Sequence, residues 1–222
     1  MILYHGSPTI VEKPTHGKGK AYNDYGPGFY CTEHIDLAKE WACTEGTDGY
    51  ANRYELDLTG LPVLHLTTGE YSLLNWLAIL MENRIGRLSS PVAKRGREYL
   101  LQNFLPDYKD YDVIIGYRAD DSYFSFARAF VENGISLGQL GRAMHLGKLG
   151  EQVVLKSKKA FDAIRFLGYE QADNTIDYAR RTARDAGARR AYDRELEKED
   201  LEGVYMRDLI REGMKQDDPR LR

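Results

Sequence analysis

Short runs of apolar residues with the spacing of β-strands dominate the first half of the chain. Residues 53–58 alternate polar and apolar side chains, which is the pattern of a strand with one buried face. The runs 2–5, 28–32 and 63–66 are equally short, and glycine, proline or threonine residues bound them. Between them, residues 35–44 place apolar side chains on one helical stripe. This region therefore predicts four strands and one short amphipathic helix.

Helical and strand patterns follow each other at irregular spacing in the middle of the chain. The run 112–116 is compact and apolar, and 151–157 is rich in β-branched residues, so both are expected to be strands. Residues 160–166 fit a helix or a strand. Because the order is irregular rather than a repeated strand-helix-strand array, the predicted fold class is α+β. Helices are expected at 73–81, at 99–104, from 120–122 through 131, and at 136–144.

From residue 173 the chain becomes poor in large apolar residues and rich in charge. Between residues 180 and 195, arginines alternate with aspartates and glutamates at separations of three and four, which stabilises a long exposed helix. An RNA-binding or antitoxin-binding surface is the other interpretation of the arginine-rich stretch 180–194. A last amphipathic helix is expected at 203–212, and residues 216–222 are expected to form a frayed tail.

Composition and charge narrow the class of protein. The 222 residues are 42% hydrophobic and contain 31 Lys and Arg against 34 Asp and Glu, giving a formal net charge of −3. The chain can therefore bury a core, and it does not rely on bulk positive charge to hold nucleic acid. No apolar run approaches the ~20 residues of a membrane span, and the N-terminus does not resemble a signal peptide. We expect a cytoplasmic protein with no membrane contact.

Several well-known chemistries lack their usual residues. The five histidines have no helical or knuckle spacing, and Cys31 and Cys43 are too few and too far apart for a zinc or redox motif, so no metal is expected. The sequence has no phosphate-binding glycine loop followed by Lys-Ser/Thr and no Gly-x-Ser-x-Gly elbow. Kinase, nucleoside triphosphatase and esterase activities are therefore disfavoured.

Three segments carry candidate chemistry. The first is Tyr4-His5-Gly6-Ser7, at the end of the opening strand. The second is the Gly-Pro-Gly-Phe-Tyr-Cys-Thr segment at 26–32, with Trp41 eleven residues after Tyr30. The third is the Gly-Glu-Gln-Val-Val-Leu-Lys segment at 150–156. In order and spacing, these segments resemble the His-Tyr-Glu signature of ADP-ribosyltransferases of the diphtheria-toxin and poly-ADP-ribose-polymerase type.

The chain resembles more narrowly a family of uncharacterised bacterial proteins assigned to the same fold. That family's pattern includes Leu-Tyr-His-Gly-Ser, Asp-aromatic-Gly-x-Gly-Phe-Tyr, Ala-Asp-Asp after a buried strand, and Gln-Val-x-x-Lys-Ser/Thr. Matching residues lie at 3–7, 24–30, 119–121 and 152–157. The resemblance spans most of residues 2–166, and the arginine-rich stretch also looks like this family's C-terminal extension.

The resemblance implies a fold and an activity. It implies an ADP-ribosyltransferase-like core of two packed, mainly antiparallel sheets with peripheral helices at residues 1–168, followed by a helical C-terminal extension at 169–222. The implied activity is mono-ADP-ribosyl transfer from NAD, without a metal, to a macromolecular acceptor that is a protein or a nucleic acid. A bacterial toxin-like role follows, and an antitoxin is one candidate partner.

The same resemblance assigns a NAD-binding site. The nicotinamide ring is a flat cation, which aromatic faces attract, and Tyr30 and Trp41 would supply the two faces. His5 would hydrogen-bond the adenosine-side ribose, and the Gly6 backbone would hold the nicotinamide amide, with room because glycine has no side chain. The full set of implied NAD-binding residues is His5, Gly6, Ser7, Gly28, Phe29, Tyr30 and Trp41.

The acidic position of the signature is ambiguous in this sequence. Departure of nicotinamide leaves positive charge on the ribose, which a nearby carboxylate stabilises, and Glu151 fits this role beside His5 and Tyr30. Gln152 is adjacent, and neighbouring strand residues face opposite ways, so only one of the two can point into the cleft. If Gln152 faces inward, ribose hydrogen bonding remains but ionic stabilisation is lost.

Two further questions stay open at the level of the sequence. Asp120 and Asp121 either cap a helix or line the acceptor side of the cleft. The alternative to an active transferase is a catalytically inactive member of the same fold that binds a nucleotide or a partner protein. An RNA-directed enzyme that uses the arginine-rich extension is a second alternative, and the near-neutral net charge weighs against it.

Overall fold

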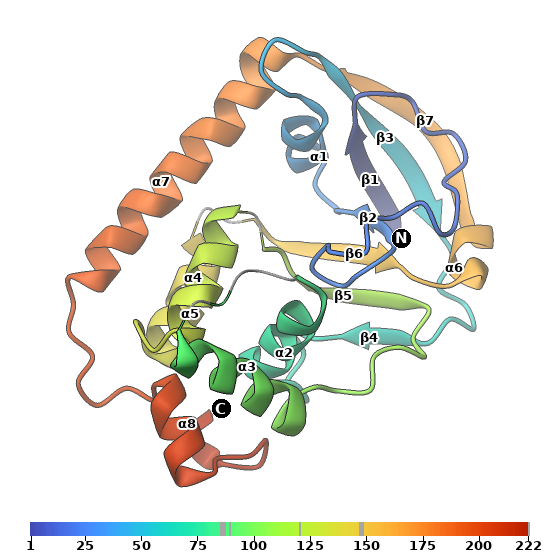
Figure 1. Ribbon diagram of the computed structural model, residues 1–222. Coiled ribbons are helices and arrows are strands. Elements are labelled where there is room, and N and C mark those ends of the chain that lie inside the picture. Colours follow the sequence, from blue (N-terminus) through green and yellow to red (C-terminus); the bar gives the residue numbers. More distant parts are fainter. Residues whose placement is uncertain (85–87, 89, 120, 147–148, 222) are drawn as a thin grey trace.

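The structure is a computed structural model that describes residues 1–84, 88, 90–119, 121–146 and 149–221. It has two β-sheets with helices around them (Figure 1). In chain order the elements are β1 (Ile2–Ser7), β2 (Phe29–Cys31), α1 (Ile35–Ala42), β3 (Gly49–Leu56), β4 (Val63–His65), α2 (Leu73–Asn83), α3 (Pro91–Asn103), β5 (Val113–Tyr117), α4 (Asp121–Val131), α5 (Leu137–Met144), β6 (Glu151–Leu155), α6 (Lys158–Asp162), β7 (Ile164–Ala172), a π-helical turn (Asn174–Tyr178), α7 (Ala179–Leu196), α8 (Met206–Glu212) and a 3-10 turn (Pro219–Leu221).

The two sheets differ in strand direction. The first sheet has the order β1-β3-β7 and is antiparallel throughout. The second has the order β2-β6-β5-β4, in which β2–β6 and β5–β6 are antiparallel and β4–β5 is parallel. The predicted α+β class is therefore confirmed, with one antiparallel and one mixed sheet.

The sheets pack against each other through one apolar cluster. Leu3 and Tyr54 contribute from the first sheet, and Phe29, Val153 and Leu155 contribute from the second. These side chains alternate along their strands with residues that face the other way, as the two-residue period of a strand requires. Burial of these apolar surfaces holds the two sheets face to face.

A short backbone bridge links the sheets beside this core. The Tyr4 amide donates a hydrogen bond of 2.7 Å to the Thr32 carbonyl, and the Thr32 amide donates one of 2.9 Å to the Tyr4 carbonyl. Because Tyr4 lies on β1 and Thr32 directly follows β2, the bridge brings the first two candidate segments of the sequence side by side. His5 directly follows Tyr4, and Tyr30 lies two residues before Thr32.

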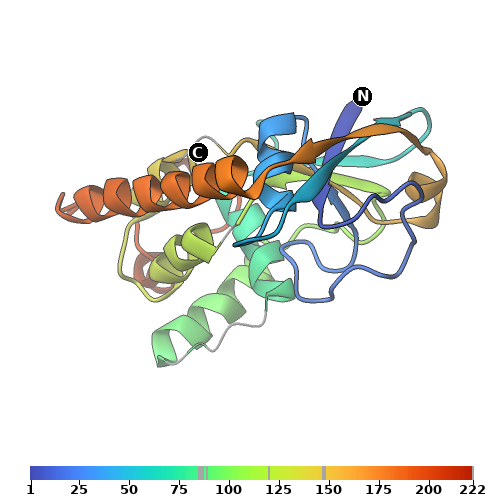
Figure 2. The same cartoon turned by 90° about the horizontal axis from the view of Figure 1, so that it is seen from above.

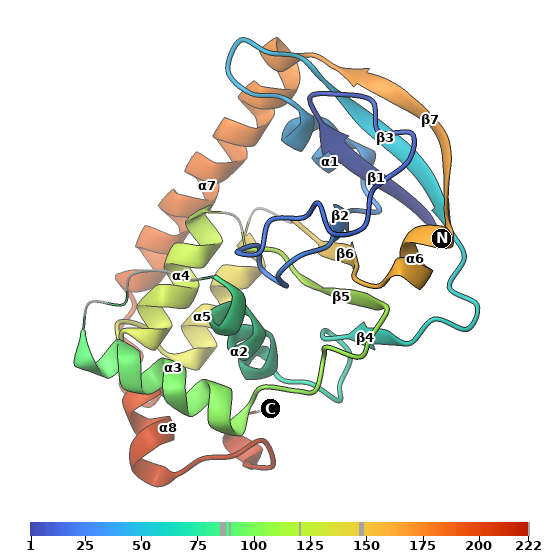
Figure 3. The same cartoon turned by 45° about the vertical axis from the view of Figure 1, so that its right-hand side comes forward.

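Helices α2 to α5 lie on the other face of the mixed sheet (Figure 3). Ile114 and Val154 point to that face and share a second buried apolar cluster with Trp76, Phe126 and Phe130. The mixed sheet is thus covered on both sides, which explains why β5 and β6 are almost continuously buried.

Helix α1 packs against β1 and β3 of the first sheet. At Gly6 the contact is so close that a Cβ atom would lie 2.1 Å from the Ala38 carbonyl oxygen and 2.8 Å from the Ala42 amide nitrogen. Both neighbours are backbone atoms, so only glycine fits there without moving the helix. The structure therefore gives Gly6 a packing role in addition to the ligand contact that the sequence suggested.

The arginine-rich segment forms helix α7, which runs along the outside of the molecule past α4 and α5 (Figures 1 and 2). The helix is not solvated on all sides, because Tyr192 stacks on Phe126 with ring centroids 3.9 Å apart and Arg142 pairs with Glu195 at 2.5 Å.

Among the described residues, no helix is long and apolar enough to span a membrane.

Some sequence predictions differ from the structure. Residues 160–166, expected to form either a helix or a strand, contain the end of one and the start of the other, because α6 ends at Asp162 and β7 begins at Ile164. β7 continues through residue 168, where the core was expected to end, and pairs with β3 as far as Ala172. The prediction of a frayed tail is wrong at Leu221, because this side chain is buried in the apolar cluster that also contains buried side chains of helices α2 to α5.

Candidate functional site

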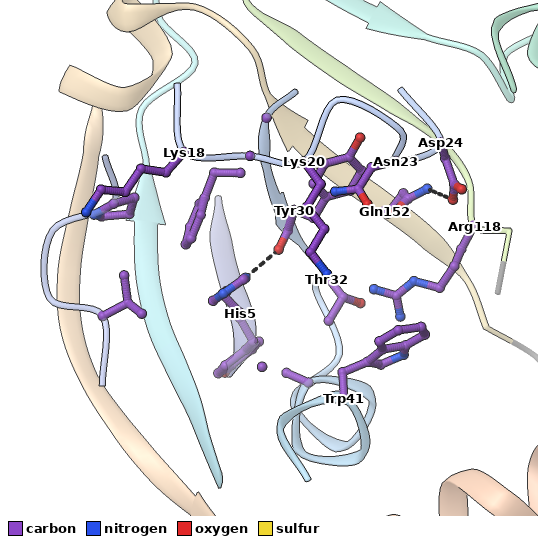
Figure 4. A pocket seen from close by; sticks show the side chains of 18 of the residues that line it. His5, Lys18, Lys20, Asn23, Asp24, Tyr30, Thr32, Trp41, Arg118 and Gln152 are labelled. Atoms are coloured by element: carbon purple, nitrogen blue, oxygen red, sulfur yellow. Dashed lines mark hydrogen bonds between the residues drawn. The ribbon is translucent and has the colours of Figure 1, made fainter. Parts of the chain in front are cut away.

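A cavity of about 930 Å³ lies where β1, β2, β6 and α1 meet the loop 8–28 (Figure 4). His5, Tyr30, Trp41 and Gln152 all line it, and they come from these four elements. Its volume is at the upper end of the ~300–1,000 Å³ typical of ligand and cofactor sites. Residues from the three candidate segments therefore converge on one cavity.

His5 is held by a hydrogen bond and by a ring contact. Its Nδ1 donates to the Tyr30 carbonyl oxygen at 2.7 Å, and its ring lies 4.3 Å from that of Phe29 (Figure 4). A carbonyl oxygen only accepts, so Nδ1 carries the proton. Burial lowers the pKa of His5 below its ordinary value, and the bond to Tyr30 only partly opposes this. The neutral ring then leaves Nε2 as a hydrogen-bond acceptor at the cavity.

The lowered pKa predicts an acid-sensitive contribution of His5 to stability. The unfolded chain binds the His5 proton near pH 6.5 and the folded chain only at lower pH, so stability is lost as the pH falls below about 6.5. We expect the free energy of unfolding to fall more between pH 7.5 and 5.5 in the wild type than in His5→Asn, measured by chemical denaturation. An equal fall in both proteins would contradict a buried neutral His5.

Tyr30 lines the cavity, and its hydroxyl already donates one hydrogen bond and accepts another. The hydroxyl donates to the Gly26 carbonyl at 2.6 Å and accepts from the Tyr25 amide at 3.1 Å. Burial raises the pKa of this phenol well above its ordinary value, so the hydroxyl stays protonated. Gly26 makes the turn with a φ of 73°, which glycine adopts without strain. Tyr30 can therefore bind a ligand through its ring but is not an acid catalyst.

Gln152 is the residue of the third segment that faces the cavity. Its Nε2 donates to Asp24 Oδ2 at 2.9 Å and to the Tyr117 carbonyl at 3.1 Å, and its side chain is almost completely buried (Figure 4). Both partners are acceptors, so the orientation of the amide is fixed. No described residue donates to its Oε1, which leaves that oxygen available to a ligand.

Asp24 holds Gln152 in place from the loop 8–28. Its Oδ2 also accepts from the Ala119 amide at 2.9 Å, and its Oδ1 pairs with Arg84 at 3.3 Å. Burial raises the pKa of this carboxyl, and the hydrogen bonds and Arg84 act in the opposite direction. Both carboxylate oxygens are engaged, so Asp24 is a positioning residue for Gln152.

Glu151 lies on the opposite face of β6 and does not line the cavity. Its Oε1 pairs with His65 Nε2 at 3.0 Å and accepts a hydrogen bond from the Thr67 hydroxyl. Glu151 shares its side of the strand with Val153, whereas Gln152 shares its side with Val154. The alternation expected from the sequence therefore directs Gln152, and not Glu151, into the cavity.

Trp41 lines the cavity, and the guanidinium groups of two arginines contact its ring. The guanidinium carbon of Arg118 lies 4.9 Å from the ring centroid, and that of Arg181 lies 4.5 Å from it. Figure 4 shows Arg118 beside Trp41 at the wall of the cavity. Sequence reasoning gave Trp41 only the role of an aromatic face, whereas the structure surrounds this face with positive charge.

The remaining predicted residues divide into three groups. Gly28 and Phe29 line the cavity together with Gly6. Ser7 does not line it, because its hydroxyl donates to the Thr9 carbonyl and accepts from Asn52 Nδ2 at 3.1 Å. Asp120 lies outside the described residues, and Asp121 is the first residue of α4, with its side chain also outside the description.

Positive charge predominates in the cavity wall. Two acidic side chains, Glu12 and Asp24, line the cavity, against six basic ones: Lys13, Lys18, Lys20, Arg84, Arg118 and Arg181. The three lysines lie on the loop 8–28 and form no ion pair with a described residue. Such a surface favours an anionic ligand. Sequence reasoning did not assign these cations to the cavity, because no local pattern shows that they converge on it.

The described residues contain no group of three or more His, Cys, Asp or Glu side chains that could hold a metal ion.

Residues 1–166 match the model of a family described as a protein of unknown function, DUF3990. The chain belongs to the DUF3990 family. Neither the curated proteins nor the solved structures contain a significant match to the chain.

The DUF3990 region contains nearly all of the candidate site. His5, Tyr30, Trp41, Gln152 and the other cavity residues up to Phe161 lie within residues 1–166. Arg181 is the one lining residue of this cavity outside that region among those described. The helix after the DUF3990 region therefore reaches the site.

Proposed function

We propose that this DUF3990 protein is an NAD-dependent mono-ADP-ribosyltransferase with an ADP-ribosyltransferase-like fold. The observation that carries the proposal is the convergence of His5, Gly6, Tyr30, Trp41 and Gln152 on one cation-lined cavity. Each residue alone has an ordinary structural explanation, but their arrangement fits the separate parts of NAD. The acceptor is a macromolecule, either protein or nucleic acid, in a toxin-like reaction.

The geometry suggests how NAD would bind. The Nε2 of neutral His5 would accept a hydrogen bond from the adenosine-side ribose, and the Tyr30 ring would contact the nicotinamide face. The lysines of the loop 8–28 would face the pyrophosphate, whose charge they complement. Trp41 would line the site with the ring that holds the Arg118 and Arg181 guanidinium groups.

Gln152 would act on the nicotinamide ribose during the reaction. The bond between ribose C1′ and the nicotinamide nitrogen breaks, and the bonding electrons leave with neutral nicotinamide. A nucleophilic atom of the acceptor then bonds to C1′ and releases its proton to solvent. Gln152 Oε1 would accept a hydrogen bond from a ribose hydroxyl and place the negative end of the amide dipole near the developing positive charge.

Binding of NAD followed by release of nicotinamide tests this function. We expect calorimetric titration of the full chain to give a dissociation constant between about 1 µM and 1 mM, a usual range for enzyme substrates. Incubation with a cell lysate and NAD labelled in its adenosine moiety should transfer label to protein or RNA. Absence of NAD binding would overturn the proposal.

A catalytically inactive, nucleotide-binding protein is the second candidate. The specific observation that favours it is that a neutral amide faces the cavity where the broader ADP-ribosyltransferase signature has a glutamate, while both oxygens of Asp24 are engaged. This candidate predicts NAD binding without nicotinamide release and without transfer of label. The same two measurements therefore separate it from the active enzyme.

A further inference from the structure

Two contacts fix helix α7 to helix α1 at the edge of the cavity. Glu40 of α1 is buried and pairs with Arg184 of α7, and the adjacent Trp41 contacts Arg181. Arg181 and Arg184 are three residues apart, so they lie on the same face of α7. The register of α7 on α1 therefore determines where the Arg181 guanidinium sits.

Arg181 and Arg184 are the half-buried arginines of this helix, and of the two only Arg184 has an ion pair with a described residue. Arg180 pairs with Asp177, Arg184 with Glu40 and Arg189 with Asp185. Arg181 is half-buried, and it forms no hydrogen bond or ion pair with a described residue. Its guanidinium lies over the Trp41 ring, a contact that uses the face of the guanidinium and not its N–H groups.

The location of Arg181 is the second observation. It lines the main cavity and also a neighbouring cavity of about 370 Å³ between α1 and α7. Trp41 is the other residue that both cavities share. A half-buried cation with uncommitted donors at a junction of two cavities is positioned to bind an anionic group of a ligand.

We propose that Arg181 binds a phosphate of the dinucleotide in the main cavity, so that the C-terminal helix is part of the binding site. This inference rests on the proposed function, because it takes NAD as the ligand. A guanidinium presents paired N–H donors that match phosphate oxygens, and stacking on Trp41 limits its rotation. The inference gives the arginine-rich segment a role within the chain's own site.

The test compares substitutions at two positions on the same helix. We expect Arg181→Gln to raise the dissociation constant for NAD by about tenfold or more, as loss of a charge-assisted hydrogen bond predicts. Arg181→Lys keeps the positive charge but lacks the paired N–H donors of a guanidinium. Its dissociation constant for NAD should lie between those of Arg181→Gln and the wild type. Arg190→Gln is the matched control, since Arg190 is exposed and lines neither cavity, and it should bind NAD like the wild type.

The salt dependence of binding separates a phosphate contact from a structural effect. Loss of one phosphate contact should reduce the slope of log affinity against log salt concentration in Arg181→Gln but not in Arg190→Gln. NAD affinity and salt slope unchanged from the wild type in Arg181→Gln would overturn the inference, as would tighter binding. If the wild type itself does not bind NAD, the proposed function fails instead, so the two failures are distinguishable.

Discussion

Replacing Gln152 by alanine is expected to lower the rate of nicotinamide release at saturating NAD by about 100-fold, the usual effect of removing one group that stabilises a transition state. Gln152 is the residue of β6 whose polar side chain faces the cavity, and its Oε1 accepts no hydrogen bond from a described residue. The loss should appear in kcat more than in the dissociation constant for NAD, because the positive charge on the ribose develops only during the reaction.

Glu151 supplies the matched control for this experiment. It is adjacent to Gln152 but pairs with His65 on the other face of the strand. We expect Glu151→Gln to keep nicotinamide release within about twofold of the wild type, because the residue touches neither the ligand nor the Gln152 network. If Glu151→Gln loses activity and Gln152→Ala keeps it, the assignment of the inward-facing residue is wrong.

The second large effect is expected on stability, at the contact between α1 and α7. Replacing Arg184 by methionine leaves the buried Glu40 carboxylate without its guanidinium partner. Breaking one side of a buried ion pair costs about 3–5 kcal/mol, and we expect a decrease of this size in the free energy of unfolding at pH 7. Arg165→Met is the control, because its partner Glu55 is largely exposed, and a loss below about 1 kcal/mol is expected there.

The stability of Arg184→Met should also depend on pH in a definite direction. Burial raises the pKa of Glu40, while Arg184 opposes that rise, so removal of Arg184 raises the pKa further. When the folded pKa exceeds the unfolded one, stability is present at low pH and is lost as the pH rises through the folded value. Urea denaturation should therefore show the variant approaching the wild type as the pH falls toward about 4.3, the ordinary pKa of glutamate. A difference independent of pH would contradict a buried, charged Glu40.

Local sequence patterns predicted the elements better than their arrangement. The alternation at 53–58 identified part of β3, and the apolar run 112–116 identified β5. Helix α3 begins at Pro91, eight residues before its expected start, because its first turns carry exposed charges and lack a continuous apolar stripe. Pairing partners such as β2 with β6 are far apart in the chain, and no local pattern encodes their order in the sheet.

The candidate site was predictable where a segment had its own signature. His5, Tyr30 and Trp41 came from such segments, and the structure brings them to one cavity. Alternation along the strand showed that only one of Glu151 and Gln152 could face inward, but choosing between them required the packing of β6. Arg181 reaches the cavity because α7 docks on α1, and a contact of this kind depends on tertiary structure alone.

The pairing of β7 with β3 has a consequence for any shortened version of this protein. The DUF3990 match ends at residue 166, but β3 remains paired as far as the contact between Gly49 and Ala172. A fragment cut at the family boundary would leave half of β3 with an open row of amide and carbonyl groups. Open rows of this kind invite strand exchange between molecules, so a fragment that stops at the family boundary is prone to aggregate.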